Sequence, residues 1–335
     1  MKGMGLPVAE SRKEAFHYSA PFDPKTGALL NQGTPAENYT DAFARHMIDV
    51  MRNNSRVVTL TAGTPGAIGF YPERREAAGK QFVDVGICEQ TATAVGAGLA
   101  KGGARPVFGV MSTFIQRAYD QLSQDIAIND LPAVVVDFAG SVWGIPDMTH
   151  LGFFDIAMVS NIPNFIFLAP ANMEEYIAAI DWAIAQTEHP VFVRTPGGAV
   201  VHTDKPVDTD FSHYVITEEE DSKVAIIGAG SFQQIALEAA GIMRQRGVNP
   251  TVINPRILSA LDTATLDTLR DYDTVITLED GIVDGGFGQK AAAYLGDSAV
   301  KVHVLGLRKE FVDRYNAAKL MHDNGITPEQ IAALA

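Results

Sequence analysis

The sequence contains very little cysteine and no long hydrophobic run. One cysteine among 335 residues, Cys88, excludes an internal disulfide and a cysteine-rich zinc site, which is typical of a reducing compartment. No apolar run approaches the roughly 18 residues that a membrane span requires, and the charged N-terminus lacks the apolar core of a secretion signal. We therefore expect a cytoplasmic protein with no membrane contact.

Basic residues are scarce as well. The chain has 26 Lys and Arg against 40 Asp and Glu, which gives a formal net charge of −14. This charge argues against nucleic acid as a partner, because nucleic-acid binding depends on basic side chains that displace counterions.

The hydrophobic share of 47% excludes disorder. At about 150 residues per domain, the length predicts two domains.

In the first half of the chain, short apolar runs alternate with helical patterns. Strands that are apolar throughout and separated by helices predict parallel strands covered on both faces. We expect strands at 57–61, 82–85, 106–111, 133–138, 165–168 and 191–193, and helices at 39–53, 89–101, 114–129 and 172–186.

The rest of the chain suggests an arm, a linker and a second alternating region. Residues 1–37 show little periodicity, which predicts an extended arm that lies against a neighbouring chain. The first domain covers 38–205, and a polar stretch at 197–221 predicts a linker. The predicted fold class is α/β, with two doubly wound domains and mainly parallel sheets. The second, smaller domain covers 215–335, with strands at 223–227, 250–253, 273–278 and 300–305 and a helix at 231–245.

Two glycine clusters stand at expected turns of the second domain. Gly228-Ala229-Gly230 occupies the place of a dinucleotide-binding fingerprint, but Gln233 replaces the third glycine, so a tight turn is the better interpretation. A dinucleotide-binding dehydrogenase is accordingly the least favoured function. The cluster at 285–288 permits either a close backbone approach or a flexible loop, and the sequence leaves both open.

Several chemically capable side chains follow expected strands. Glu89 opens the helix after strand 82–85, and Phe114 follows strand 106–111. Ligands bind at the carboxyl edge of open α/β sheets, where a buried carboxyl group can share a proton with a ring nitrogen. The competing interpretations are a helix-dipole contact for Glu89 and a core position for Phe114. Asp147, Thr149 and His150 lie in a loop suited to proton transfer or polar recognition, with a surface turn as the alternative.

With these positions in view, the chain resembles the C-terminal half of transketolases, most closely that of 1-deoxy-D-xylulose-5-phosphate synthases, over about residues 20–335. The segments that carry the resemblance are Asp84-Val85-Gly86-Ile87-Cys88-Glu89-Gln90, Ser112-Thr113-Phe114-Ile115-Gln116-Arg117, Leu131-Pro132, Thr149-His150, Ile162-Pro163-Asn164, Ala169-Pro170, the glycine-rich loop at 279–288 and Pro21-Phe22-Asp23-Pro24.

The resemblance implies a pyrimidine-binding domain, a transketolase C-terminal domain and thiamine diphosphate as the cofactor. Glu89 would hydrogen-bond N1′ of the aminopyrimidine and thereby promote formation of the nucleophilic C2 carbon. Phe114 would stack on the pyrimidine, with Ile87 and Met111 as further cofactor-binding residues. His150 would act catalytically at the substrate. The remaining substrate-binding candidates are Asp147, Arg117, Arg194 and Thr64.

Half of the cofactor site is missing from this sequence. The family binds the diphosphate and a divalent cation such as Mg²⁺ through a Gly-Asp-Gly motif, and the nearest match here is Gly296-Asp297-Ser298. We therefore predict no metal ligand in this chain. The resemblance instead implies a partner α subunit that holds the diphosphate and the metal, in an α2β2 assembly with contact between the two β chains. The chain would be active only with that partner.

Departures from the family pattern bear on the substrate. The resemblance would place a tyrosine at Met111 and phosphate-binding arginines near Phe138 and at Gly197, and no Lys or Arg occurs from Ala118 through Val193. Because bidentate arginines make phosphate recognition strong, we expect an aldehyde acceptor without a strict need for phosphate. A ketone or 2-oxo acid would donate the two-carbon ketol or acyl unit.

Two further alternatives remain open. The E1 β subunit of a 2-oxo acid dehydrogenase complex has the same two domains and also pairs with an α chain, but its product passes to a lipoyl group. A non-catalytic subunit that keeps the fold is the other. The joint presence of Glu89, Phe114 and His150 favours an enzyme.

Overall fold

The structure is a computed structural model that describes residues 3–17, 19, 21–30, 36–219 and 222–335. Residues 1–2, 18, 20 and 31–35 of the predicted arm and residues 220–221 of the predicted linker lie outside the described residues. By its contacts the chain divides into two units, Met1–Glu37 and Asn38–Ala335.

The described residues of the first unit form one short helix and a closed turn. Helix α1 spans Pro7–Ser11. An isolated antiparallel bridge joins Phe22 to Leu29, and the ring of Phe16 lies edge-on to that of Phe22, with centroids 4.7 Å apart. The described part of the predicted arm thus has local structure of its own. Its contact with a neighbouring chain stays a prediction.

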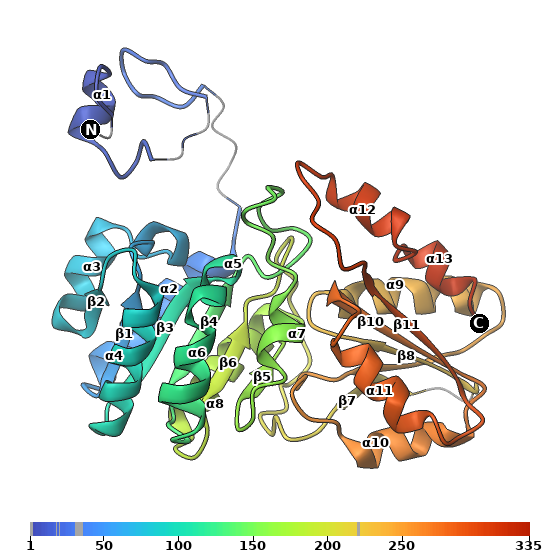
Figure 1. Ribbon diagram of the computed structural model, residues 1–335. Helices are drawn as coiled ribbons and strands as arrows, with labels where there is room; N and C mark the ends of the chain where they lie inside the picture. Colours follow the sequence, from blue (N-terminus) through green and yellow to red (C-terminus); the bar gives the residue numbers. More distant parts are fainter. Residues whose placement is uncertain (1–2, 18, 20, 31–35, 220–221) are drawn as a thin grey trace. The chain divides into compact units, whose positions relative to one another are not determined.

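A parallel six-stranded sheet forms the centre of the first domain (Figure 1). The strand order is β2-β1-β3-β4-β6-β5, and every neighbouring pair is parallel. All residues of β4 and β6 are buried, so both faces of the sheet are covered, as the apolar runs predicted. The strands are β1 (Val57–Thr61), β2 (Phe82–Asp84), β3 (Arg105–Met111), β4 (Val134–Phe138), β5 (Ile166–Leu168) and β6 (Val191–Arg194).

Two long helices of this domain, α2 and α8, begin at a capping side chain. The side chain of Asn38 accepts the backbone N–H of Asp41 at the start of α2, and Asn172 does the same for Glu175 at α8. Helices α2 and α8 contact each other. The helices are α2 (Tyr39–Asn53), α3 (Pro72–Ala78), α4 (Glu89–Lys101), α5 (Ser112–Ile115), α6 (Tyr119–Gln121), α7 (Asp155–Val159) and α8 (Met173–Ala185).

The segment predicted to be helical at 114–129 is helical over 112–127, but it is not one regular α-helix. The segment consists of α5, a 3₁₀ turn at Gln116–Ala118, α6 and a π-helical stretch at Leu122–Ala127. Apolar spacing in a sequence shows that a segment is helical, but it does not show where the hydrogen-bond repeat changes.

The second domain contains a five-stranded sheet of order β11-β10-β8-β9-β7. Its strands are parallel except β7, which runs antiparallel to β9 at the edge. Helices α9 and α13 lie on one face of the sheet, and α10 and α11 lie on the other (Figure 1). The elements are β7 (Val215–Glu218), β8 (Val224–Gly228), α9 (Phe232–Gln245), β9 (Thr251–Asn254), α10 (Thr263–Thr268), β10 (Thr274–Ile282), α11 (Phe287–Leu295), β11 (Lys301–Leu307), α12 (Ala317–Asp323) and α13 (Pro328–Ala332).

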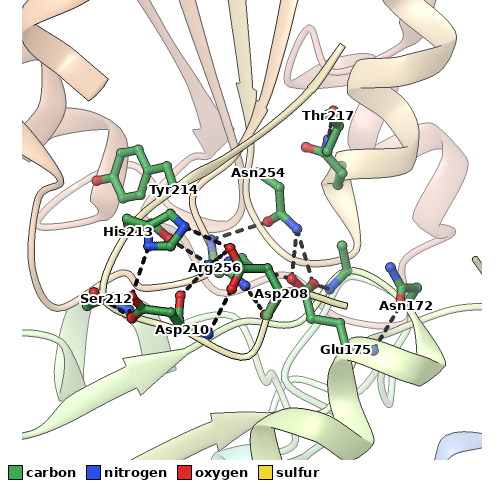
Figure 2. A network of polar contacts seen from close by, with 12 residues as sticks. Asn172, Glu175, Asp208, Asp210, Ser212, His213, Tyr214, Thr217, Asn254 and Arg256 are labelled. Carbon is green, nitrogen blue, oxygen red and sulfur yellow. Dashed lines mark hydrogen bonds and ion pairs between the residues drawn. The ribbon is translucent and has the colours of Figure 1, made fainter. Parts of the chain in front are cut away.

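The described part of the segment predicted as a linker is instead packed against both domains. It includes strand β7, and Phe211 and Tyr214 are only 1% and 3% exposed. The buried guanidinium of Arg256 donates to three backbone carbonyl oxygens of residues 208–213 (Figure 2). The prediction failed because residue composition does not reveal which backbone carbonyls a distant arginine will bind.

Buried polar contacts join the two domains. Glu175 of α8 accepts hydrogen bonds from the side chain of Asn254 in β9 at 3.1 and 3.2 Å (Figure 2). Burial raises the pKa of Glu175. Leu168, at the end of β5, forms an isolated bridge with Ile257.

In the part of the chain that the structure describes, no helix combines the length and apolar character needed to cross a bilayer.

Candidate active site at the carboxyl edge of the first sheet

The candidate residues follow four adjacent strands. Thr64 follows β1, Glu89 follows β2, Phe114 follows β3 and His150 follows β4. The order β2-β1-β3-β4 makes these strands neighbours, and they are all parallel. Their carboxyl ends therefore share one edge of the sheet, as the sequence predicted.

Glu89 is a buried carboxylate at the start of α4. The residue is 2% exposed, and its Oε2 atom has no hydrogen-bond partner among the described residues. The nearest cation, Nη1 of Arg117, lies 3.5 Å from Oε2, and the Arg117 side chain is 59% exposed. A buried acceptor without a donor costs about 1–3 kcal/mol, so each such group calls for an explanation. Arg117 thus lies beside Glu89, and its role in substrate binding stays a prediction.

The loop before Glu89 is held by Asp84. Its Oδ1 atom accepts the backbone N–H groups of Gly63, at 2.8 Å, and Gly86, at 2.9 Å. These bonds connect the turn after β1 to the turn after β2. Gly63 has a φ of +75°, and a Cβ there would lie 2.8 Å from the Ile87 side chain, so a larger residue cannot fit. Ile87, a predicted cofactor-binding residue, is 79% exposed at this edge.

The start of α5 brings Phe114 to His150. The two rings lie edge to face with centroids 5.4 Å apart. The hydroxyl of Ser112 donates to the carbonyl of Gly152 at 2.9 Å, and that of Thr113 donates to the carbonyl of Thr149 at 3.1 Å. These two bonds fix the loop after β4 against the helix after β3.

A tight turn at 147–150 positions His150. The backbone N–H of His150 donates to the carbonyl of Asp147 at 2.8 Å. The carboxylate of Asp147 accepts both the backbone N–H and the hydroxyl of Thr149, and these bonds lower the pKa of Asp147. The Thr149 Oγ1 atom lies 2.8 Å from Nδ1 of His150.

Two other candidates occupy less informative positions. Met111 ends β3 and is half-buried, in register with the buried Phe138 of β4. Thr64 is half-buried, and its hydroxyl lies 3.3 Å from that of Thr61. Their predicted roles stay predictions.

Arg194 is not brought to this group. It is 3% exposed, donates to Asp155 through Nε and Nη2, and forms a second ion pair with Asp280 of β10. Because Asp280 belongs to the second domain, Arg194 acts as a buried connection between the two sheets. The structure offers no free guanidinium here for the substrate role predicted from the sequence, and that role has no geometric support.

The sequence analysis missed the buried acids near Arg194. Neither carboxylate oxygen of Asp137, in β4, has a hydrogen-bond partner among the described residues. Burial and the neighbouring Asp155 raise the pKa of Asp137 well above its ordinary value. One signal could have identified it, since Asp137 is the only charged residue of the fully buried run Val134–Phe138.

Glu279 explains the glycine cluster at 285–288. Its carboxylate accepts the backbone N–H groups of Phe287 and Gly288 at 2.9 Å, at the start of α11. A Cβ at Gly286 would lie 2.5 Å from the carboxylate oxygens. The glycines therefore permit a close backbone approach, the first of the two alternatives. Burial raises the pKa of Glu279 to about 7.

Away from this edge, the described residues form a cavity but no arranged metal centre. Within the described ranges, no group of three or more His, Cys, Asp or Glu side chains is arranged to hold a metal ion. A cavity of about 560 Å³ lies in the second domain and contains none of the candidate residues. Its walls are Val283, Asp284, residues 306–309, Asp323 and Asn324.

Two family models match the chain. The model for the transketolase pyrimidine-binding domain matches residues 36–201, and the model for the transketolase C-terminal domain matches residues 213–331. The chain belongs to the transketolase family. The carboxyl edge that holds Glu89, Phe114 and His150 is thus part of a transketolase pyrimidine-binding domain.

Curated relatives of this transketolase-family chain are 1-deoxy-D-xylulose-5-phosphate synthases. The enzyme of Symbiobacterium thermophilum is 35% identical across 100% of this chain and 51% of its own length. That of Clostridium tetani is 34% identical across 98% of this chain and 53% of its own length. The chain spans about half the length of the curated relatives it matches.

Solved structures show the same fold. A protein described as a split gene transketolase in an inactive β4 tetramer has a TM-score of 0.78 and 23% identity, covering 88% of this chain and 96% of that one. A Pichia stipitis transketolase in complex with sedoheptulose 7-phosphate has a TM-score of 0.74 and 16% identity, covering 90% of this chain and 46% of that one.

Proposed function

We propose that this chain is the C-terminal, or β, subunit of a split transketolase-like enzyme that depends on thiamine diphosphate. The enzyme transfers a two-carbon ketol or acyl unit to an aldehyde. The observation that carries this proposal is the carboxylate of Glu89, which is 2% exposed and has an Oε2 atom without a donor. A buried acceptor at a sheet edge suits the protonated ring nitrogen of an aminopyrimidine.

The neighbouring side chains also fit this cofactor. Phe114 offers an aromatic face for the pyrimidine, while Ile87 and Met111 offer apolar contacts. His150 lies against the Phe114 ring and provides a polar contact for the substrate. Bound thiamine diphosphate supplies a nucleophilic carbon that attacks ketones and 2-oxo acids.

A partner α subunit provides the other half of the site in this proposal. The chain spans 51–53% of its synthase relatives and contains no Gly-Asp-Gly motif with which to hold the diphosphate and Mg²⁺. Among solved structures, the split gene transketolase supports a separate β chain as a workable form of this fold. We infer an α2β2 assembly with contact between β chains.

The acceptor in this proposal needs no phosphate. No Lys or Arg occurs from Ala118 through Val193, and Arg194 is paired with two carboxylates. At position 197 a Cβ would lie 2.4 Å from the Ser141 side chain, which leaves no room for an arginine in this backbone. Of the predicted substrate-binding arginines, only Arg117 would then be left to contact a phosphate, and the paired bidentate arginines that make phosphate recognition strong would be missing at these positions.

Calorimetry and kinetics test this function. The chain alone, a candidate partner chain bearing a Gly-Asp-Gly domain, and their mixture are each titrated with thiamine diphosphate and Mg²⁺. We expect tight binding and carboligation only in the mixture, with kcat/KM for glyceraldehyde similar to that for glyceraldehyde 3-phosphate. Full activity of the chain alone would contradict the split enzyme. A strong preference for the phosphorylated aldehyde would contradict the substrate class, and reductive acylation of lipoamide would identify an E1 β subunit instead.

A further inference from the structure

A bent row of three polar groups stands beside Phe114. The Thr149 hydroxyl contacts a carboxylate oxygen of Asp147 and lies 2.8 Å from Nδ1 of His150, and the same Asp147 oxygen lies 3.5 Å from that Nδ1. We propose that Asp147 and Thr149 determine which ring nitrogen of His150 carries the proton, and so act as positioning residues for the imidazole. The assignment of the proton rests on this geometry alone, whereas its use in catalysis rests on the proposed function.

Counting protons along the row gives the tautomer. A hydroxyl has one proton to donate, and an ionised carboxylate only accepts. The same Asp147 oxygen also accepts the Thr149 backbone N–H at 2.9 Å, and these bonds favour the ionised carboxylate by lowering its pKa. The Thr149 hydroxyl proton therefore points to Asp147. The Thr149 oxygen then presents a lone pair to Nδ1, so Nδ1 must carry a proton to complete the hydrogen bond.

The row is held by contacts from three directions. Thr113, at the start of α5, donates to the carbonyl of Thr149 at 3.1 Å. From the second domain, the Asp313 carboxylate accepts the backbone N–H of Met148 at 3.4 Å. Phe114 packs edge to face on the imidazole itself. This anchoring holds the Thr149 hydroxyl beside both of its partners before a substrate binds. Substrate binding therefore does not have to order the loop, which saves the conformational entropy that ordering would cost.

The consequence is a free acceptor on the other side of the ring. With the proton on Nδ1, neutral His150 has its lone pair on Nε2, and no described residue forms a hydrogen bond with that atom. Nε2 can then accept a hydrogen bond or a proton from a substrate hydroxyl. The Asp147 carboxylate oxygen also lies 3.5 Å from Nδ1, so its negative charge faces the ring nitrogen that holds the proton. Asp147 thereby gains a positioning role, and the direct substrate contact predicted from the sequence stays a separate prediction.

Nitrogen NMR of the 335-residue chain tests the tautomer directly. The eight histidines are labelled with ¹⁵N in the ring, and spectra are recorded above about pH 8, where histidine is ordinarily neutral. The signals that disappear in His150→Gln belong to His150. We expect a protonated Nδ1 and an unprotonated Nε2 in the wild-type chain and in Thr149→Ser, which keeps the hydroxyl.

Two variants should move the proton to Nε2. Asp147→Ala frees the Thr149 hydroxyl to donate to Nδ1 and also removes the carboxylate oxygen 3.5 Å from that nitrogen. Thr149→Val removes the nearer acceptor for Nδ1–H and leaves only the Asp147 oxygen, which is too far for a good hydrogen bond. The proposal is overturned if the wild-type ring carries its proton on Nε2, or if the ring keeps the Nδ1 proton in a folded variant. The wild-type spectrum decides the assignment even where a variant does not fold.

A kinetic arm tests the positioning role separately. In the enzyme assembled with its partner, Thr149→Val should lower kcat at least about tenfold with little change in KM, and should have no further effect in a His150→Gln background. An unchanged kcat, with the tautomer shifted as expected, would refute the role in catalysis. If no combination of chains is active, the proposed function fails, while the NMR result still decides the tautomer.

Discussion

The Oε2 atom of Glu89 lies 3.5 Å from Nη1 of Arg117, which pairs a carboxylate side chain that is 3% exposed with a guanidinium side chain that is 59% exposed. This separation is too long for a good hydrogen bond. Arg117 therefore offsets part of the buried charge and leaves Oε2 without a donor. The arrangement keeps an acceptor ready for a ligand at the expense of stability.

Replacing this carboxylate should separate stability from function. Glu89→Gln removes a buried charge and retains the shape, so we expect the free energy of unfolding of the isolated chain to rise by about 1 kcal/mol. In the assembled enzyme, kcat should fall at least about 100-fold, because the amide cannot exchange a proton with the cofactor ring. Urea unfolding and steady-state kinetics measure the two effects. Glu238→Gln, on the exposed side of α9, is the control that should change neither.

The connection between the two sheets can be tested at Arg194. Arg194→Met leaves the carboxylates of Asp155 and Asp280 buried without their cation, so we expect a loss of about 3–5 kcal/mol in the free energy of unfolding. Arg52→Met breaks an ion pair whose side chains are 63% and 69% exposed, and it should cost less than about 1 kcal/mol. Equal losses in the two variants would show that the Arg194 connection does not hold the domains together.

Glu279 should make the free energy of unfolding depend on pH in the range between the pKa of this carboxyl group in the unfolded chain and its pKa in the folded chain. Burial raises the pKa of this carboxyl group on folding from 4.5 to about 7. A group with a raised pKa contributes stability below its unfolded value, and that contribution is lost as the pH rises through its folded value. The stability of the wild-type chain relative to Glu279→Gln should therefore fall by up to about 3 kcal/mol from pH 4.5 to pH 8.

Unfolding of both proteins by urea at several pH values measures this slope. The amide of Glu279→Gln can accept only one of the two backbone N–H groups from Phe287 and Gly288, but that cost does not vary with pH. Asp49→Asn, on the exposed side of α2, is the control and should run parallel to the wild type. A flat difference between wild type and Glu279→Gln would contradict the buried titration.

The close approach at the start of α11 predicts opposite outcomes for two glycine substitutions. Gly286→Ala places a Cβ 2.5 Å from the Glu279 oxygens and should destabilise the chain by about 1–3 kcal/mol. Gly241→Ala, inside α9, meets no atom within 4 Å and should stabilise the chain by about 0.5–1 kcal/mol through helix propensity. Thermal unfolding of the two variants compares them. A stable Gly286→Ala would mean that the loop can retract from Glu279.

Much of the candidate site could be predicted from local sequence. Glu89 and Phe114 each follow a parallel strand by a few residues, and such positions meet at one edge whatever the details of packing. Arg194 also lies at the end of a strand, so its position in the sequence looked the same as that of a residue at the sheet edge, such as Glu89 or Phe114. Its guanidinium lies in the interior because Asp155 and Asp280, from two other parts of the chain, meet it there.

The sequence by itself determined the alternation of buried strands and helices, the family, and the set of residues at the sheet edge, because these depend on short-range patterns and on strand order. Only the tertiary structure decided which polar groups find partners. It left Glu89 without a donor, enclosed the polar segment at 208–213 around Arg256, and aligned Asp147 and Thr149 with His150. Hydrogen bonds require distances near 3 Å and correct angles between groups, and spacing along the sequence does not specify either.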